Sequence, residues 1–320
     1  MKVSILIVTR NHAADLALTL AAMKRLSIPQ TLEAEWVVID NGSTDDTREV
    51  VRSAAVGLLP LKYVHEPRPG QCHGRNRGLA ESCGDVILFA DDDVHPPVNW
   101  VGGMCGPILG GMADASCGGV KLAPHLLRSW MTPTHRNWLA ATEWISAGAP
   151  ESLVGANMAF SRDVLRRIPG FDVELGPGKL GFWDDTLFSR QLIEAGYRIA
   201  DCLATLVEHH FDPSRLRRES WIDAAKRRGE SRAYVGHHWE HWGMRMGWLR
   251  VKRAEIRLNA WRASNRGKLE PEGCDEVELS MIYELAQLKW RLRESCSWRN
   301  YERRGLKRRI QTGGFEPALV

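Results

Sequence analysis

The first hundred residues alternate between short apolar segments and amphipathic ones, and this alternation constrains the fold more than any other feature. Four segments are predicted to be strands, and the first is continuously apolar and β-branched, which is typical of a strand in a parallel sheet covered on both faces. They are residues 3–9 (VSILIVT), 35–40 (EWVVID), 61–66 (LKYVHE) and 85–90 (DVILFA). Because a helical pattern separates each from the next, the sequence predicts an α/β fold with a mostly parallel sheet and helices on both faces.

The intervening segments have the features of helices. In the first, Leu16 and Leu20 fall on one stripe of a helix. In the second, Ser43 or Thr44 is the expected N-cap, and acidic residues follow in the first turn. The third helix begins in the glycine- and arginine-rich segment 73–82 (HGRNRGLAES).

Polar residues follow three of the predicted strands, at the point where each strand ends. These residues are Thr9-Arg10-Asn11, Asp40-Asn41 and Asp91 to Asp93. In open α/β sheets, ligands bind in the crevice beyond the carboxyl ends of the strands, and a nucleotide is the usual ligand. No G-x-G-x-x-G motif follows the first strand, so a dinucleotide site of the Rossmann type is excluded.

The run of Asp91, Asp92 and Asp93 calls for a nearby positive charge. Adjacent carboxylates repel one another, and burying an unpaired carboxylate is costly. In an extended segment Asp91 and Asp93 share one face, while Asp92 takes the other. Two carboxylates on one face form a hard-oxygen site suited to Mn²⁺ or Mg²⁺. The alternative is a solvated acidic turn before Pro96 and Pro97.

The composition is that of an ordinary globular protein, with 44% hydrophobic and 26% charged residues among 320. The seven cysteines form no CxxC pair, so free thiols in a reducing cytoplasm are expected. The apolar run near the N-terminus is too short for a signal peptide, and no segment has the roughly 18 uninterrupted apolar residues of a membrane span. The sequence therefore predicts a cytoplasmic protein and leaves open a contact with the inner face of the membrane.

The composition changes near residue 236. Residues 1–200 have a slight excess of acidic side chains, whereas residues 201–320 have an excess of basic ones. The segment 237–248 (HHWEHWGMRMGW) is rich in aromatic residues, and two basic helical patterns follow it. Two apolar stripes predict a helical hairpin around a turn in residues 267–275. The stripes are Val251, Leu258 and Trp261, and Met281, Leu285, Leu288 and Leu292.

Seven motifs resemble, in their order, those of the family 2 inverting glycosyltransferases, which have the GT-A, Rossmann-like nucleotide-sugar-binding fold. The motifs are SILIVTRN, VVIDNGSTDDT, GRNRGLAES, DVILFADDD, GANMAFSRDVL with a later GFD, WDDTLFSRQLIEAGYRI and LVEHHFDP. The resemblance covers roughly residues 3–235. It implies a catalytic domain of residues 1–235, with a nucleotide-binding half in 1–100 and an acceptor-binding half in 101–235. Residues 236–320 would be a basic, Trp-rich helical extension.

The resemblance assigns the nucleotide to the carboxyl edge of the sheet. Base and ribose would be held by Thr9, Arg10, Asn11 and Asp40. The Asp40 carboxylate would accept from a pyrimidine imide N–H, although an Asx turn is an alternative role. Arg75, with Arg77 as a second candidate, would contact ribose and phosphates, unless these arginines only begin a solvated helix. Close approach of the loop would rest on Gly70, Gly74 and Gly78.

The same resemblance places a metal beside the nucleotide. Asp91 and Asp93 match the family's D-x-D pair, in which Asp93 would bind the metal and Asp91 would reach the ribose or the metal's water shell. Asp92 matches a variable position. His209 matches a histidine that can complete the metal site, and His210 lies on the other face of the strand. A purely structural role is the alternative for either histidine.

The sequence Trp183-Asp184-Asp185 departs from the family's usual Glu-Asp pair. The resemblance assigns the catalytic base to Asp185 and places Asp184, in the position of the Glu, at the donor site. The alternative is a capping role, because acidic side chains favour the first turn of a helix. With Asp185 as the base, an acceptor hydroxyl would displace the nucleoside diphosphate in one step and invert the anomeric carbon.

The resemblance implies a nucleoside-diphosphate sugar as donor, linked to UDP, another pyrimidine or GDP. The acceptor would be the hydroxyl of a carbohydrate, a lipid-linked molecule or another compound in polysaccharide or glycoconjugate synthesis. Two alternative functions are a non-catalytic sugar-nucleotide-binding protein and a sugar-nucleotidyltransferase. The second would require a glycine loop directly after the first strand, where this chain has TRNHAADL.

The helices beyond residue 236 have three interpretations. Their apolar stripes favour a packing role, either as a helical cap or as a homodimer contact. Contact of a basic, Trp-rich face with anionic lipid comes next. Nucleic acid is the least supported partner, because no binding motif occurs.

Overall fold

A single sheet organises the fold, in a computed structural model that describes residues 1–55, 60–143, 145, 152–265 and 270–306. The eight strands lie in the order β3-β2-β1-β4-β7-β6-β8-β5, and β5 and β7 run antiparallel to their neighbours. The strands are β1 Lys2–Thr9, β2 Glu33–Asp40, β3 Leu61–His65, β4 Val86–Asp91, β5 Val94–His95, β6 Ala115–Leu122, β7 Asn157–Ser161 and β8 Ile199–His209. This arrangement confirms the mostly parallel sheet.

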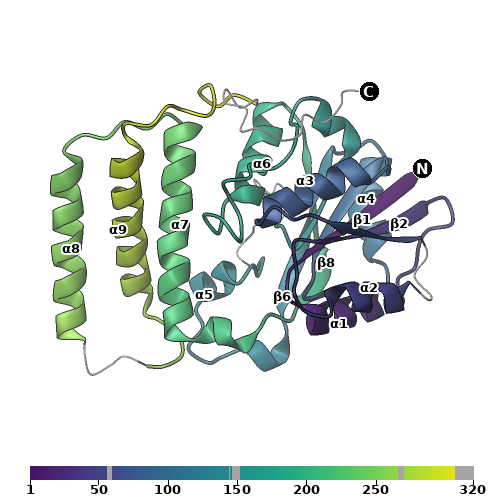
Figure 1. Cartoon of the computed structure of the whole chain (residues 1–320), viewed down its shortest axis with the longest axis horizontal. Coiled ribbons are helices and arrows are strands. Elements are labelled where there is room, and N and C mark those ends of the chain that lie inside the picture. The colour runs from purple at the N-terminus through teal and green to yellow at the C-terminus, as the bar shows by residue number, and fades with distance from the viewer. Residues whose placement is uncertain (56–59, 144, 146–151, 266–269, 307–320) are drawn as a thin grey trace.

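Helices cover both faces of the sheet (Figure 1). Because side chains alternate along a strand, Ile5 and Ile7 share a core with α1, α2 and α4, whereas Leu6 and Val8 share one with α3 and α6. The helices are α1 Ala13–Met23, α2 Thr47–Ala54, α3 Gln71–Glu81, α4 Trp100–Leu109, α5 Pro133–Trp138, α6 Asp184–Glu194, α7 Arg218–His238, α8 Gly247–Ser264 and α9 Glu276–Glu294.

Helix α2 begins later than the sequence suggests. Its N-cap is Asp46, so the prediction of Ser43 or Thr44 as the cap is wrong. The reason is that these two residues make contacts across the sheet edge. Ser43 Oγ accepts from the backbone N–H of Asn11 at 2.9 Å, and the N–H of Thr44 donates to the Asn11 side chain at 2.7 Å.

Two glycines of α3 serve helix packing. A Cβ on Gly74 would lie 2.5 Å from Val8 Cγ1, and one on Gly78 would lie 2.8 Å from Ile39 Cδ1. Both separations are shorter than real Cβ contacts, so these glycines let α3 approach β1 and β2. The expectation that they open the loop to phosphates is therefore wrong for both, because they face the sheet.

The C-terminal helices form a layer beside the sheet, with α9 between α7 and α8 (Figure 1). A Cβ on Gly229 of α7 would lie 2.3 Å from the carbonyl oxygen of Tyr283, so this glycine sets how closely α7 and α9 pack. Because α7 spans Arg218–His238, the division expected after residue 235 falls inside a helix. The division into a catalytic domain and an extension stays a prediction.

The helical hairpin predicted for the tail is present as α8 and α9. Leu258 and Leu288 are buried as expected, but Leu292 is 41% exposed. The buried side of α9 is turned toward α7, because Leu279 and Ile282 enter the core that the two helices share. Of the turn expected in residues 267–275, residues 267–269 lie outside the described part of the chain. In that described part, no helix combines the length and apolar character needed to cross a membrane.

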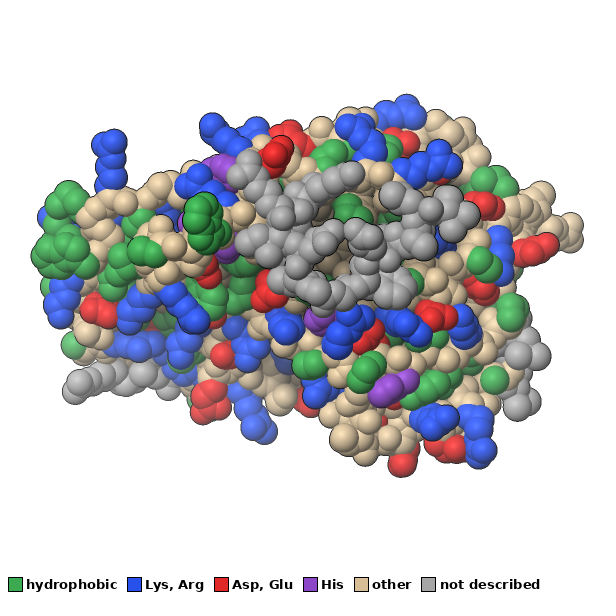
Figure 2. Space-filling model, turned by 45° about the horizontal axis from the view of Figure 1, so that its top comes forward, with side chains coloured by type: hydrophobic (Ala, Val, Ile, Leu, Met, Phe, Trp, Pro, Cys, Tyr) green, Lys and Arg blue, Asp and Glu red, His purple; other side chains and the backbone are tan. Residues whose placement is uncertain are grey.

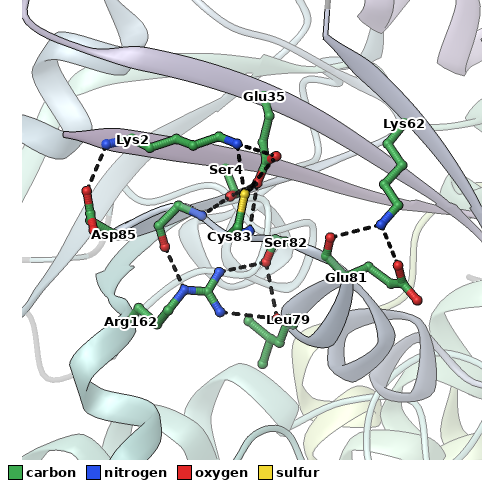
Figure 3. A network of polar contacts seen from close by, with 11 residues as sticks. Lys2, Ser4, Glu35, Lys62, Leu79, Glu81, Ser82, Cys83, Asp85 and Arg162 are labelled. Carbon is green, nitrogen blue, oxygen red and sulfur yellow. Dashed lines mark hydrogen bonds and ion pairs between the residues drawn. The ribbon is translucent and has the colours of Figure 1, made fainter. Parts of the chain in front are cut away.

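At the amino ends of β1, β2 and β4, charged side chains close on one another (Figure 3). Lys2 Nζ lies 2.9 Å from Glu35 Oε2, and the Lys2 backbone N–H donates to Asp85 at 2.8 Å. Arg162, directly after β7, donates from Nε to the carbonyl oxygen of Gly84 at 2.6 Å. We refer to this group as the amino-edge network. It ties four strands together at the end of the sheet opposite the predicted site.

Candidate active site

The loops after β1 and β2 are tied to each other at the carboxyl edge. Asn11 has a φ of 56°, a left-handed conformation that asparagine tolerates better than most residues. Its bonds to Ser43 and Thr44 fix this conformation. Beside it Arg10 is exposed. Thr9 is buried, and its Oγ1 has no hydrogen-bond partner among the described residues.

Asp40 is buried with both carboxylate oxygens engaged. Oδ1 accepts from the Ser43 N–H at 2.7 Å, and Oδ2 accepts from the Tyr63 hydroxyl at 2.6 Å. Burial, helped by this bond, raises the pKa of Tyr63 to about 12. The contact with Ser43 is the Asx-type turn considered as the alternative role. Each oxygen retains a further lone pair, so the contact with a nucleobase stays a prediction.

Asn41 positions the loop before α3, a role that the sequence did not reveal. Its Nδ2 donates to the carbonyl oxygens of Glu66 and Arg68, at 3.1 and 2.7 Å. Its Oδ1 accepts from the N–H of Gly70 at 2.9 Å. One side chain therefore satisfies three backbone groups of this loop. The only sequence feature that could have indicated this role of Asn41 is its position directly after β2.

Asp92, matched to a variable position, has a specific partner. Strand β4 ends at Asp91, and a turn follows. His12 Nδ1 lies 3.2 Å from Asp92 Oδ2, and the Thr19 hydroxyl donates to the Asp92 carbonyl oxygen at 2.8 Å. The hydrogen bond with Asp92 raises the pKa of His12 to about 9. The second aspartate therefore anchors the start of α1.

Asp93 and His209 face each other. His209 Nε2 lies 3.2 Å from Asp93 Oδ2, and His209 Nδ1 lies 3.0 Å from the carbonyl oxygen of Leu139. A carbonyl oxygen only accepts, so Nδ1 carries a proton, and the neutral ring presents the lone pair of Nε2 to the carboxylate. Two facing lone pairs repel, so this pair requires a cation between its members, either a second proton on His209 or a metal ion.

A divalent metal fits this pair. Two ligand atoms at right angles around a cation, with bonds of about 2.1 Å, lie about 3 Å apart. The observed separation of Asp93 and His209 is 3.2 Å. A hydrogen bond from the other ring nitrogen to a backbone carbonyl is the usual support of a metal-binding histidine. Asp91, the other expected ligand, lies instead beside Gln71 and Arg75.

Arg75 is buried between two carboxylates. Its Nη1 pairs with Asp184, and its Nη2 lies 3.8 Å from Asp91 Oδ1. The ring of Phe171 lies 5.2 Å from the guanidinium carbon, and a Cβ on Gly155 would lie 2.4 Å from Nη2. Only 3% of Arg75 is exposed, so in this conformation it organises the acidic residues. Its contact with phosphates stays a prediction.

The two acids beside Arg75 respond to burial in the same way. Burial raises the pKa of Asp91 to about 6, because the charged form loses hydration, although Arg75 opposes the change. Burial also raises the pKa of Asp184, again against Arg75. The carboxyl edge therefore holds carboxylates whose charge is only partly compensated by the protein.

Asp185 lies in the first turn of α6. Trp183, just before the helix, has a φ of 72°, which turns the chain sharply. Asp185 is half-buried, and its Oδ2 accepts from the N–H of Gly155 at 2.9 Å. Its Oδ1 accepts from the N–H of Thr186 at 2.6 Å. Oδ1 also accepts from the Thr186 hydroxyl at 3.2 Å. These bonds orient the carboxylate and leave a lone pair on Oδ2.

The structure thus brings together Asp93 with His209, and Arg75 with Asp91 and Asp184. Arg77 lies elsewhere, because it pairs with Glu81 one turn along α3, at 2.6 Å. His210 faces away from the Asp93–His209 pair, and its Nε2 lies 2.9 Å from Glu208 Oε1. Neither Arg77 nor His210 was a principal candidate.

A second group of metal-type ligands lies between α7 and α9. Among the described residues, His237, His238 and Glu294 have ligand atoms within 4.8 Å of one another. His238 Nδ1 accepts from the N–H of Asn300 at 3.2 Å, so its Nε2 carries the proton and donates to Glu294 at 3.3 Å. With neutral histidines this pattern is complete, whereas the Asp93–His209 pair needs an added proton or a metal ion.

The model of glycosyl transferase family 2 matches residues 4–168, slightly more than half of the chain. The chain belongs to glycosyl transferase family 2. This finding confirms the resemblance that the motifs indicated. The match contains most of β1, all of β2 to β7, and Asp91 to Asp93, whereas Asp185 and His209 lie beyond it.

A curated relative with a similar sequence is also a glycosyltransferase by name. Glycosyltransferase AglE of Haloferax volcanii is 29% identical over 120 residues, which are 37% of this chain and 39% of that protein. The matches span less than half the length of the first curated relatives.

Solved structures share the GT-A fold with this chain. The mannosyltransferase PcManGT from Pyrobaculum calidifontis, in complex with GDP-Man and Mn²⁺, has a TM-score of 0.59 at 18% identity and covers 92% of this chain and 87% of its own. S. aureus TarS 1–349 in complex with UDP-GlcNAc has a TM-score of 0.50 at 18% identity, with 84% and 76% covered.

Proposed function

We propose that this chain transfers a sugar from a nucleoside-diphosphate sugar to an acceptor hydroxyl, with inversion of the anomeric carbon. The observation that carries the proposal is the Asp93–His209 pair, which requires a cation and lies at the same sheet edge as Asp185. A site with an unmatched ligand pair, partly compensated acids and an oriented carboxylate is typical of catalysis. Membership in glycosyl transferase family 2 supports the reaction class.

The donor would lie along the ends of β1, β2 and β4. Thr9, Arg10, Asn11 and Asp40 would hold base and ribose, and Asp93 with His209, and Asp91 through water, would hold Mn²⁺ or Mg²⁺. A bound divalent metal supplies charge neutralisation for the departing diphosphate, an effect worth several kcal/mol. The Mn²⁺ in the PcManGT structure supports this choice. Arg75 would hold Asp91 and Asp184 in place and would contact phosphate after a change of side-chain conformation.

Asp185 would act as the base. The N–H of Gly155 fixes one of its oxygens and leaves a lone pair directed elsewhere. That lone pair would take the proton of the acceptor hydroxyl while the hydroxyl attacks the anomeric carbon. A positioned base of this kind typically contributes about 10²–10⁴-fold. Because the displacement is a single step, no covalent enzyme intermediate is required.

The donor base stays open between UDP, another pyrimidine and GDP. GDP-Man in PcManGT and UDP-GlcNAc in TarS are bound by the same fold, and each is a reasonable first ligand. The acceptor would be the hydroxyl of a carbohydrate, a lipid-linked molecule or another compound. Polysaccharide or glycoconjugate synthesis is the expected setting.

The extension of residues 236–320 would locate the enzyme, in the cytoplasm and at the inner face of a membrane. On α8, Trp248 and Ile256 are 71% and 59% exposed, beside the exposed cations Arg253 and Arg257. Figure 2 shows hydrophobic and basic side chains together at this end of the molecule. Such a mixed face suits an anionic lipid surface. A homodimer contact through the same helices is the alternative.

Thermal unfolding with a panel of nucleotide sugars and Mn²⁺ tests the proposal. A ligand at about 100 times its Kd stabilises the folded state by about 2.7 kcal/mol. We expect one base to stabilise the protein only when the metal is present. Product analysis then separates the alternatives, because a glycosyltransferase releases nucleoside diphosphate, a nucleotidyltransferase releases pyrophosphate, and a binding protein releases neither.

A further inference from the structure

Arg228 of α7 is held between aromatic rings. Its guanidinium carbon lies 4.2 Å from the centre of the Phe182 ring and 4.9 Å from the centre of the Trp138 ring. Its Nη2 donates to the carbonyl oxygen of Trp138 at 3.0 Å. The rings restrict the guanidinium to one place.

The charge of Arg228 is not matched by an acid. No carboxylate oxygen of the described residues lies within 4.0 Å of it, and its Nε is buried with no hydrogen-bond partner among those residues. Burial lowers its pKa to about 10. Arg232, one turn further along α7, pairs with Glu240 at 2.8 Å. Arg228 is half-buried, and a partly desolvated cation without an anion is costly, so this position suits a bound anion.

Arg228 lies between the two functional ends of the site. The carbonyl oxygen of Trp138 accepts from Arg228, and that of the next residue, Leu139, accepts from His209. The carbonyl groups that bind Arg228 and His209 therefore belong to consecutive residues of the chain. On the other side, Phe182 lies three residues before Asp185 in the sequence. Asp185 is the acid whose negative charge most favours the protonated form of Arg228.

We propose that Arg228 binds an oxyanion of the acceptor, a phosphate or a carboxylate, close to the hydroxyl that receives the sugar. Arginine's planar fork matches both groups, and Nη1 of Arg228 is the terminal nitrogen that is not committed to the carbonyl oxygen of Trp138. Trp138 and Phe182 offer apolar faces to the rest of the acceptor. This inference rests on the proposed function, because it is the base Asp185 that identifies this end of the site as the acceptor end.

The test uses the full chain with Mg²⁺ and a saturating nucleoside diphosphate, GDP or UDP, so that the donor phosphate site is filled. Inorganic phosphate and, separately, acetate are titrated at constant ionic strength, and thermal unfolding is followed. We expect at least one anion to stabilise the wild type. Arg228→Met should weaken that anion's apparent affinity at least tenfold, while nucleoside diphosphate affinity stays within twofold.

The same variant distinguishes a ligand-binding role from a structural one. If the guanidinium is an unmatched buried charge, Arg228→Met should unfold at the same temperature as the wild type or higher. Arg227→Met, the matched control on the same helix, removes an exposed cation that pairs with Asp223 at 2.6 Å. It should keep the anion response of the wild type. Arg228→Lys, which keeps the charge and loses the fork, should weaken the response less than Arg228→Met.

Three results would overturn the inference. They are no anion response in a wild type that binds nucleoside diphosphate, an unchanged response in both Arg228 variants, and a response lost equally in Arg227→Met. Absence of nucleoside diphosphate binding in the wild type would instead contradict the proposed function, so the two failures are distinguishable.

Discussion

At the amino edge of the sheet Glu35 is surrounded by donors, whereas at the carboxyl edge the carboxylate of Asp93 faces a single ring nitrogen, Nε2 of His209. Glu35 accepts from the N–H of Cys83 at 2.8 Å and pairs with Lys2 (Figure 3). Asp93 has His209 at 3.2 Å, whose proton is committed to a backbone carbonyl. The amino edge is complete within the chain, whereas the Asp93–His209 pair takes up a cation, either a proton or a metal ion.

The pKa shifts of Glu35 at the amino edge and Asp91 at the carboxyl edge differ in sign. Burial raises the pKa of Glu35, but hydrogen bonds from Cys83, Ser4 and Lys2 outweigh it and lower the value to about 2. At the other edge burial dominates and raises the pKa of Asp91 to about 6. The protein therefore stabilises the charged form of Glu35 and leaves that of Asp91 under-compensated. The difference teaches that charged residues indicate a ligand site only where their charges are left unmatched.

The largest effect should come from Arg75, which compensates two acids at the carboxyl edge. Arg75→Met leaves Asp184 and Asp91 buried without their cation, and we expect a loss of about 3–5 kcal/mol in the free energy of unfolding. Urea denaturation measures it. The double variant Arg75→Met with Asp184→Asn should recover part of the loss, because the unmatched charge is removed. No recovery would contradict the pairing.

Asp185→Asn should act on the reaction and little on stability. Asparagine still accepts from the N–H of Gly155 but is a poor proton acceptor. We expect transfer to fall by about 10²-fold or more while donor affinity stays within a few-fold, because base catalysis acts on the transition state. Single-turnover transfer beside a donor titration measures both. Thr186→Ala, which removes the hydroxyl that donates to Asp185 Oδ1 at 3.2 Å and keeps the carboxylate, is the control. Near-wild-type transfer by Asp185→Asn would leave the base unassigned.

Glu35→Gln should have the opposite effect to Asp185→Asn, because it should lower stability and leave the reaction unchanged. Loss of the ion pair with Lys2 should cost about 1 kcal/mol of stability and leave turnover per folded molecule unchanged. Because the folded-state pKa lies below the usual 4.5, the contribution of Glu35 is present above pH 4.5 and is lost as the pH falls toward 2. Stability of Glu35→Gln should therefore depend less on pH in this window. An activity loss beyond the stability loss would break the contrast between the edges.

The smallest effect concerns the extension. Trp248→Ala should weaken binding to vesicles containing anionic lipid several-fold and leave turnover in solution unchanged. Co-sedimentation with anionic and neutral vesicles measures it, and Leu18→Ala, at an exposed position on α1, is the control. A wild type that ignores anionic vesicles would favour the dimer or packing interpretation.

The sequence predicted β1 to β4, whose local residue patterns are typical of strands. β1, β2 and β4 each contain a continuous apolar run, β3 is a shorter mixed segment, and their order along the chain and polar ends follow from local rules. The N-cap of α2 was missed because Ser43 and Thr44 bind Asn11, which is distant along the chain. The extent of α7 was missed for a similar reason. Its packing against α9 carries the helix through a change of composition.

The site was predictable where position alone decides. Asp93 and His209 lie at strand ends, and the family motifs identify both. The partners of Asp92 and Arg75 were not predictable, because His12 and Asp184 are far from them along the chain and only tertiary contact joins them. Arg228 lies in none of the motifs identified in the sequence. Its unmatched charge becomes visible only when its surroundings are known.

The central claim is that the carboxyl edge binds a nucleoside diphosphate through a divalent metal held by Asp93 and His209. Calorimetric titration of GDP and UDP into the full chain, with Mn²⁺ and after exhaustive chelation, tests it most directly. We expect one nucleotide to bind with Mn²⁺ and to lose at least tenfold in affinity both after chelation and in Asp93→Asn, because a neutral amide is a poorer ligand for a hard cation. Equal affinity with and without metal, or undiminished binding by Asp93→Asn, would contradict the claim.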